Sequence, residues 1–222
     1  MIKKIIIFLI LFLVTIFFFF VLTPLSQPRI ERGVLSIYFM EEKVGYEEYS
    51  WERTSGGYLL AVRGRMTKPT TMEIDKLTLK LDSNFIAQHF YFSGSVGGLE
   101  QQVVSTISEG EVENLLRVAG QERKSKIKIR RDALLLPNPI FSTYLVLTKK
   151  FGCSLQERIE LSAYIIPQLE ASFTLEPQEE NPCRLIMKLG GIEVEIETDN
   201  QGNLNRLSIP SQKLQVVMNR ET

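Results

Sequence analysis

Four acidic side chains near the C-terminal end of this chain have the type and spacing that acid–base chemistry would need. Glu193, Glu195 and Glu197 alternate along the stretch IEVEIETD, and Asp199 follows them. If this stretch is a β-strand, the glutamates share one face at intervals of about 6–7 Å, a separation that two cooperating carboxyl groups can use. Catalytic carboxyl groups, however, need surroundings that push their pKa values apart. A plain alternation with aliphatic residues supplies none, so we interpret the glutamates as the solvated face of a strand.

A basic counterpart lies in the segment ERKSKIKIRRD. Lys126, Lys128 and Arg130 alternate with isoleucines, which again indicates a solvated strand face. Two alternatives remain open. The three cations could form a dock for anionic lipid headgroups or for an acidic partner surface. They could also pair across the sheet with the glutamates of residues 193–197, because opposite charges on neighbouring strands stabilise a sheet modestly.

Cys153 and Cys183 are the only two cysteines of the chain, and they are candidates for a disulfide. Closing a loop of about 30 residues would stabilise the fold by roughly 3–4 kcal/mol through the entropy of the unfolded chain. The expected strand order sets a geometric difficulty, since it places the two cysteines two strands apart, or roughly 9–10 Å. A disulfide needs Cα atoms within about 7 Å, so Gly152 and the turn before Cys183 would have to bend to close the gap.

Other signs of chemistry are sparse. Lys and Arg number 26, and so do Asp and Glu, so the balanced charge argues against a general nucleic-acid partner. The single histidine, His89, leaves no material for a Ser-His-Asp hydrolase or a His-rich metal site. The turn at 199–203 lacks the ligand spacing of a calcium loop. We therefore expect no catalytic residue, no metal and no cofactor, and keep an enzyme of unrecognised type as an alternative.

The N-terminus carries the clearest signal. After MIKK, an unbroken apolar run extends from Ile5 to Leu22, or about 27 Å as a helix, against a hydrocarbon core of roughly 30 Å. Lys3 and Lys4 precede it, which by the positive-inside rule keeps residues 1–4 as a cytoplasmic stub. No small-residue cleavage site follows. We predict an uncleaved transmembrane anchor at 5–22 in the inner membrane, with a cleaved signal peptide and a buried core helix as alternatives.

After the anchor, the pattern predicts a tether at 23–32 and an extracytoplasmic domain at 33–222. Period-two segments of roughly 8–12 residues alternate with turn signals such as SGG at 55–57 and DSN at 82–84, which favours an antiparallel meander. One segment, 134–152, has a different period. Asn138 could cap a helix there, with Pro139 at its first position, Lys149 and Lys150 in its last turn and Gly152 just beyond. Such a helix would be apolar on most sides and therefore buried, although another strand is the alternative.

Taken together, these features resemble a group of bacterial envelope proteins. They are an early strand pair around KVGYEEYSW, a long meander, a central apolar helix, and a closing turn and strand. The closing pattern consists of Asp199, Gly202, Leu204, Arg206, Leu207, Ile209 and Pro210. The chain is similar in this pattern to the LolA/LppX-like half-barrel group. The resemblance implies a curved sheet closed by a helix over an apolar cavity that carries lipid or lipoprotein acyl chains. An uncleaved anchor departs from a shuttling carrier and fits a tethered relay better.

The expected fold is therefore mainly β, with a large curved antiparallel sheet wrapped around one central helix. A strongly curved sheet around a helix often leaves apolar volume, and ligand sites in such folds are mostly apolar. The candidate cavity residues are Phe85, Phe90, Phe92, Phe141, Tyr144, Leu145 and Phe151. Their alternative role is plain core.

Two functions follow from these alternatives. The first is a membrane-anchored binding or scaffold protein of the envelope with a filled core and an envelope protein partner. The second is a carrier that binds a lipid or lipoprotein in a cavity under a movable helix.

Overall fold

The computed structural model describes residues 30–166 and 169–219. The predicted stub at 1–4 and the predicted anchor from Ile5 to Leu22 lie outside the described residues, as does the tether up to residue 29. Within the described ranges, no helix is long and apolar enough to cross a bilayer. The first strand begins at Ile30, so residues 30–32, which were expected to belong to the tether, are part of the sheet.

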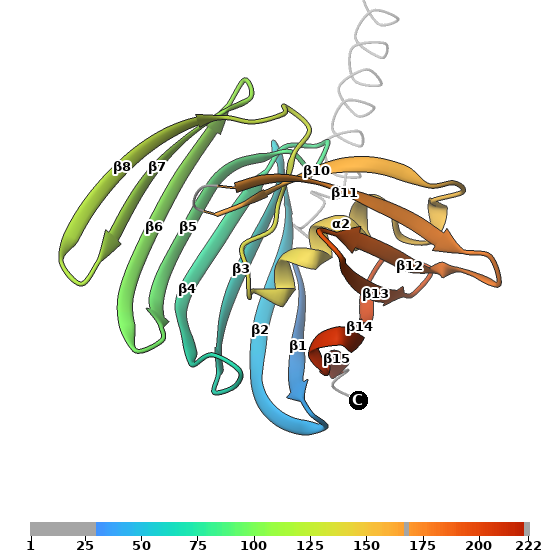
Figure 1. Ribbon diagram of the computed structural model, residues 1–222. Coiled ribbons are helices and arrows are strands. Elements are labelled where there is room, and N and C mark those ends of the chain that lie inside the picture. The colour runs from blue at the N-terminus through green and yellow to red at the C-terminus, as the bar shows by residue number, and fades with distance from the viewer. Residues whose placement is uncertain (1–29, 167–168, 220–222) are drawn as a thin grey trace, which may run out of the picture.

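The domain is built on one curved sheet of 15 strands, shown in Figure 1, so the prediction of a mainly β fold with a large curved sheet is confirmed. The first eight strands are β1 (Ile30–Phe39), β2 (Glu42–Thr54), β3 (Gly57–Met66), β4 (Met72–Leu81), β5 (Ala87–Val96), β6 (Leu99–Ser108), β7 (Glu111–Val118) and β8 (Gln121–Lys128). The remaining strands are β9 (Leu134–Leu135), β10 (Ile159–Ile165), β11 (Leu169–Gln178), β12 (Asn181–Leu189), β13 (Ile192–Thr198), β14 (Leu204–Ile209) and β15 (Leu214–Asn219).

The sheet consists of two meanders that meet along their first and last strands. Strands β1–β8 pair in sequence order, and so do β10–β15, while β9 adds a short parallel pairing to β10. The two meanders join because β1 pairs with β15 in an antiparallel register that runs from Val34–Asn219 to Phe39–Leu214. Strands from opposite ends of the described chain therefore lie side by side in the middle of the sheet, and β8 and β9 are left at its two ends.

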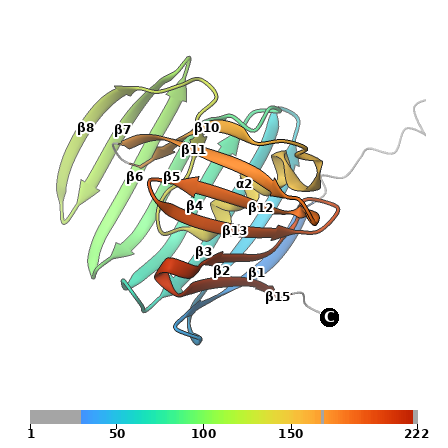
Figure 2. The ribbon, with the colours of Figure 1, turned by 45° about the vertical axis from the view of Figure 1, so that its right-hand side comes forward.

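The segment between the meanders carries the helix. It contains a 3₁₀ turn, Phe141–Thr143, then the helix α2, Tyr144–Lys150, and a second 3₁₀ turn, Gly152–Ser154. Figures 1 and 2 show α2 on the inner side of the curved sheet, between the two meanders. The buried residues of this segment are Phe141, Ser142, Thr143, Leu145, Val146, Leu147 and Thr148, so the expectation of a helix buried on most sides is confirmed.

The start of the helix differs from the expectation. Asn138 does not cap it and Pro139 is not its first residue, because helical geometry begins only at Phe141 and no local side chain caps that turn. The end agrees with the expectation, since Lys149 and Lys150 lie in the last turn and Gly152 adopts a positive φ of 43°. A left-handed backbone at this position is the usual end of a helix and favours glycine.

The two meanders close over the helix through side chains. Asn114 of β7 donates a hydrogen bond to the hydroxyl of Tyr164 on β10 (2.8 Å) and accepts one from Ser105 of β6 (2.6 Å). Close by, the backbone N–H of Arg130 donates to the carboxylate of Glu170 on β11 (2.9 Å). The sheet thus folds back toward itself and encloses the helix, and its two end strands, β8 and β9, do not pair with each other within the described residues.

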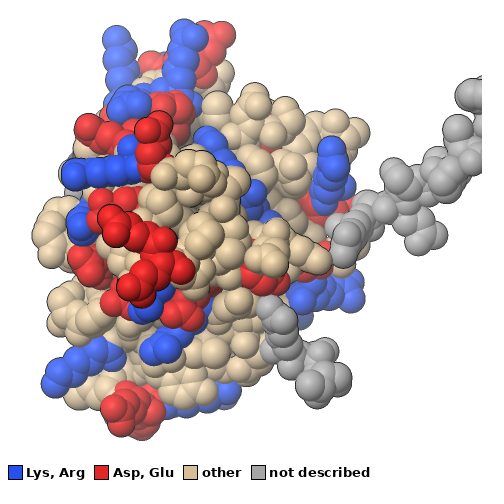
Figure 3. Space-filling model, turned by 90° about the vertical axis from the view of Figure 1, so that its right-hand side faces the viewer, with Lys and Arg blue, Asp and Glu red and all other residues tan. Residues whose placement is uncertain are grey.

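The charged strand faces point outward, as predicted. Val194 and Ile196 of β13 are buried, whereas Glu193 is exposed. Glu195 and Glu197 approach Arg184 of β12 at 2.7 and 3.6 Å. Acidic and basic side chains are interspersed over this side of the molecule (Figure 3). The glutamates of β13 therefore balance local cations and form no separate acidic site.

The proposed pairing between the basic segment and these glutamates is wrong. Lys126 of β8 contacts Glu111 and Glu113 of its neighbour β7, at 2.6 and 3.1 Å. Arg130 forms a two-pronged contact with Asp132, at 3.1 and 2.9 Å. The sheet order explains the error, because β8 and β13 belong to different meanders and are not neighbours.

The disulfide between Cys153 and Cys183 is present, with the two Cα atoms 4.1 Å apart. The expected separation of 9–10 Å was wrong because Cys153 does not lie at the start of β10. It lies in the 3₁₀ turn after α2, and that turn packs against β12, which carries Cys183. The disulfide therefore ties the end of the helical segment to the second meander.

Candidate functional site

The N-terminal end of the helical segment rests on one buried carboxylate. Glu47 of β2 is fully buried, and its side-chain oxygens accept hydrogen bonds from the backbone N–H groups of Phe141 (2.9 Å) and Ser142 (2.6 Å). The hydroxyl of Ser142 also donates to this carboxylate. The first N–H groups of a helical segment have no partner within it, so Glu47 does the work of a capping residue from 94 positions away in the sequence.

Burial controls the protonation of this carboxylate. Removal from water raises the pKa of Glu47 above its usual value of 4.5, although its hydrogen bonds with Ser142 and Phe141 act in the opposite direction. Among the described residues, no lysine, arginine or histidine forms an ion pair with it. The partial positive charge at the start of the helical segment is the compensation that the fold provides.

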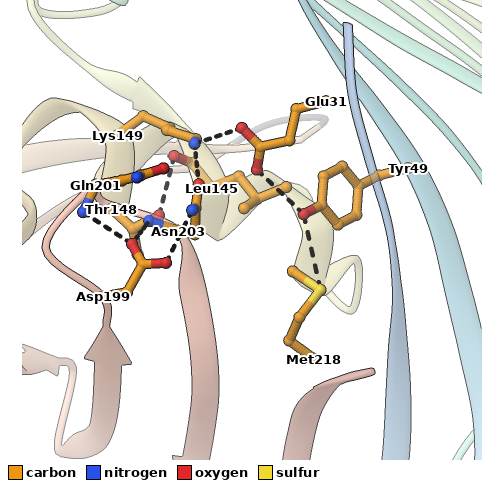
Figure 4. A network of polar contacts seen from close by, with 9 residues as sticks. All are labelled: Glu31, Tyr49, Leu145, Thr148, Lys149, Asp199, Gln201, Asn203 and Met218. Carbon is orange, nitrogen blue, oxygen red and sulfur yellow. Dashed lines mark hydrogen bonds and ion pairs between the residues drawn. The ribbon is translucent and has the colours of Figure 1, made fainter. Parts of the chain in front are cut away.

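The C-terminal end of α2 is held by a second polar network, drawn in Figure 4. The ammonium group of Lys149 lies 2.7 Å from the carboxylate of Glu31 on β1, and it also donates to the side chain of Asn203. Only 13% of the Lys149 side chain is exposed. The hydroxyl of Tyr49 on β2 points at Glu31 and Met218, and burial, followed by the charge of Glu31, raises the pKa of Tyr49. Lys149 thereby connects the helix to both meanders, through an ion pair with Glu31 and a hydrogen bond to Asn203.

The turn between β13 and β14 supports this network. The carboxylate of Asp199 accepts hydrogen bonds from the backbone N–H groups of Gln201 and Asn203, each at 2.9 Å, and from the Asn203 side-chain amide. Gly202, with a φ of 74°, packs so tightly against α2 that a Cβ atom would lie 2.7 Å from the carbonyl oxygen of Thr148. Asp199 therefore shapes a turn that receives the helix, which agrees with its interpretation as a turn residue.

A hollow of about 1180 Å³ opens beside this network. Arg32, Ser50, Ala61, Arg63 and Thr78 line it along β1–β4, and the turn at 201–205 adds Gln201, Asn203 and Asn205. Ser50, Ala61 and Thr78 alternate with core residues of their strands, so most of the floor is the outer face of the sheet. We name this feature the β1–β4 hollow. Its lining is mixed, because apolar side chains such as Ile30, Val34 and Met218 join the polar and charged ones. Its wide mouth suits a partner surface better than an enclosed apolar ligand.

A second hollow of about 740 Å³ continues across the outer face over β4–β7 and shares Asp75 with the first. Its lining includes Glu73, Glu100, Gln102 and Arg117. The outer face of the first meander is therefore hollowed over most of its width, and polar side chains line both hollows.

The candidate cavity residues lie elsewhere. Phe90, Phe92, Phe141 and Leu145 are buried in the core that packs around the helix, and Phe85, Tyr144 and Phe151 are partly buried against it. Phe85 stacks on Tyr58 with ring centroids 4.6 Å apart. None of these seven residues lines either hollow. The structure brings six of them to the helix or its surrounding sheet core and places Phe85 in a hairpin turn.

Sequence reasoning missed the residues that hold the helix. Glu47 carried one usable signal, because it lies on the same strand face as the aromatic residues Tyr49 and Trp51, both of which are buried. A glutamate on an apolar face needs a partner. Glu31 and Lys149 carried no comparable signal, since their pairing depends on how the two meanders close.

Comparison with known proteins identifies no family for this chain. No protein-family model matches the chain, and no curated protein gives a significant match. One solved structure is similar, a crystal structure of a DUF1089 family protein from Pseudomonas aeruginosa. The sequences are 11% identical, the TM-score is 0.43, and the match covers 80% of this chain and 90% of that one. At this level of similarity the match assigns neither a family nor a function.

We expect Glu47→Ala to destabilise the domain by about 2–4 kcal/mol, because it leaves two buried N–H groups without acceptors. Glu47→Gln should cost less and should change the pH dependence of stability. A carboxyl group with a raised pKa binds its proton more tightly in the folded state, so its contribution to stability falls as the pH rises above 4.5. The stability difference between wild type and Glu47→Gln should shrink over that window in denaturant titrations. Glu48→Gln, on the opposite face of the strand, is the control. A stability difference between wild type and Glu47→Gln that does not change with pH would contradict a raised pKa of Glu47.

We expect Gly202→Ala to lower the free energy of unfolding by about 2 kcal/mol more than Gly191→Ala does. Both glycines have a positive φ, 74° and 82°, so both alanines carry backbone strain. Only at Gly202 would the new methyl group meet backbone atoms of α2, since nothing lies within 4 Å of the corresponding Cβ position at Gly191. If the two variants lose the same stability in thermal and denaturant unfolding, the close contact between the turn at Gly202 and α2 does not contribute to stability.

Proposed function

We propose that this chain is a non-catalytic binding protein of the bacterial cell envelope, anchored in the inner membrane by residues 5–22, that holds a partner protein on the outer face of its sheet. The observation that carries the proposal is the fixed position of the helix. Contacts from Glu47, from Lys149 and from the disulfide hold the helical segment to both meanders. A protein whose interior is held closed in this way binds on its surface.

The same contacts argue against the carrier alternative. A carrier with its cavity beneath a helix must move that helix to admit an acyl chain. Here such a movement would strip the buried carboxylate of Glu47 of its hydrogen bonds and break the pairing of Lys149 with Glu31. Losing the partners of a buried charge costs several kcal/mol. Movement would also be limited by the disulfide, which fixes Cys153 to β12.

An anchor at residues 5–22 would keep the β1–β4 hollow within reach of a partner at the membrane. Ile30 to Val34, the first described residues, line it. If residues 5–22 span the membrane, the seven residues at 23–29 can hold Ile30 at most about 25 Å from the bilayer. A partner in or near the same membrane is therefore within reach of the hollow.

We expect a photo-reactive amino acid at Ser50 or Thr78, inside the hollow, to crosslink a discrete partner when the full-length protein is irradiated in its native membranes. The same amino acid at Thr106, an exposed position on β6 outside both hollows, is the matched control. Denaturing electrophoresis should show a defined adduct at the two hollow positions and none at Thr106. Equal labelling at all three positions, or at none, would contradict a binding site in the hollow.

We expect native mass spectrometry to detect no lipid on the domain when it is released from the full-length protein by a protease site placed in the tether. The helix fills the interior, with Leu145 and Leu147 completely buried, so an acyl chain has no space beneath it. A retained lipid that disappears in Tyr144→Trp and Leu145→Trp, but persists in the exposed variant Leu99→Trp, would support the carrier and refute the surface-binding proposal.

A further inference from the structure

The edge formed by β8 is the least protected backbone of the described sheet. β8 pairs with β7 on one side, and it is the end strand of the sheet on the other. Figures 1 and 2 both show no element beside its outer edge. Eight residues at about 3.3 Å each give an edge of roughly 26 Å, with backbone N–H and C=O groups that another extended segment could pair with. The opposite end of the sheet differs, because two residues of β9 cover part of β10.

Positive charge accompanies this edge. Residues 121–131 contain six lysines and arginines and a single acid, Glu122, which gives a net charge of +5 (6 − 1). Part of this charge is used within the domain, since Lys126 pairs with Glu111 and Glu113. Arg123, Lys128 and Arg131 have no carboxylate within ion-pair distance among the described residues. Lys124 lies 3.7 Å from Glu122, but its side chain is 78% exposed. Because side chains alternate along a strand, Arg123 lies on one face of the edge and Lys124 and Lys128 lie on the other.

The charge decides which strand the edge accepts. Two β8 edges pairing with each other would set lysines and arginines of one copy against those of the other, and like charges directly opposite destabilise a sheet. Charged edges protect sheets from indiscriminate pairing in this way. An extended segment that alternates acidic and apolar residues meets no such repulsion and gains a complementary charge at each Lys or Arg.

We infer that the β8 edge is a docking site for an extended, acidic segment of a partner protein, which adds an antiparallel strand beside residues 121–128. This inference rests on the proposed binding function and names the chemistry of the partner. Backbone hydrogen bonds supply affinity, and the cations of β8 select the sequence. The outer hollows begin at the second meander and reach β7, so one partner could contact the hollow and extend a strand along the edge.

The test uses the full-length protein in detergent at about 0.15 M salt, where charges separated by more than about 8 Å are screened. The probe is a fluorescent octapeptide of alternating Glu and Val, followed by fluorescence anisotropy. Two control peptides accompany it: alternating Lys and Val, and the Glu–Val peptide methylated on its backbone nitrogens. We expect binding of the Glu–Val peptide alone, with slower amide hydrogen exchange at residues 121–128. Comparable binding of the methylated peptide would overturn strand addition, because that peptide keeps the charge and lacks the N–H donors.

The protein variants test the charge. Lys124→Glu together with Lys128→Glu should weaken binding of the Glu–Val peptide about tenfold. Each substitution reverses one exposed charge, and the two modest losses of binding free energy add up to a change of that size. Lys43→Glu together with Lys80→Glu, exposed on other strands, makes the same change in net charge and should leave binding within about twofold. Equal weakening by both pairs, or no binding by the wild type at millimolar peptide, would overturn the inference. If the peptide test fails and Ser50 and Thr78 still crosslink a partner, only the β8 docking site is refuted. If those crosslinks are absent as well, the proposed binding function is also refuted.

Discussion

The hydrogen bonds between the buried carboxylate of Glu47 and the first N–H groups of the helical segment are the contact on which the arrangement of this domain depends. The helix belongs to the segment that connects the two meanders, and it has no capping side chain of its own. Without an acceptor from the sheet, its N-terminal N–H groups would be buried without partners, which costs more than most single contacts contribute. Glu47 satisfies them and in doing so fixes the start of the helical segment over β2, the second strand of the first meander.

The remaining contacts of the helix follow from that placement. Once its start is fixed on β2, its last turn lies between β1 and the turn that joins β13 to β14. There Lys149 meets Glu31 and Asn203, and Gly202 allows the turn to approach the helix backbone. The disulfide then joins the residues that follow the helix to β12. Both meanders are thus fastened to one short helix, which explains how a sheet with two free ends keeps a closed interior.

The surface relief of the domain lies on the outside of its sheet. The outer face of the first meander carries two adjoining hollows, and its last strand leaves an edge open. Small side chains such as Ala61 and Ser50 between longer charged ones create the relief of the β1–β4 hollow. Among the residues expected to line a lipid cavity, Phe90, Phe92 and Leu145 are buried in the core around the helix. In a small domain the same aromatic and aliphatic residues can line a cavity or fill it, and their sequence pattern is identical in both cases.

The sequence by itself determined the strands, most of their turns and the existence of one buried helix, because these depend on local periodicity and turn chemistry. The alternation of Glu193, Glu195 and Glu197 with buried aliphatic residues is of this kind, and so is the hairpin at Ser55–Gly57. It also identified the two cysteines as partners, although not the distance between them.

Only the tertiary structure decided how the two meanders join, since the pairing of β1 with β15 brings together residues more than 170 positions apart and leaves no local trace. The same holds for Glu47 with Ser142 and for Lys149 with Glu31. A glutamate or lysine has the same local preferences whether water or a distant residue compensates its charge, and that compensation is settled only when the chain closes.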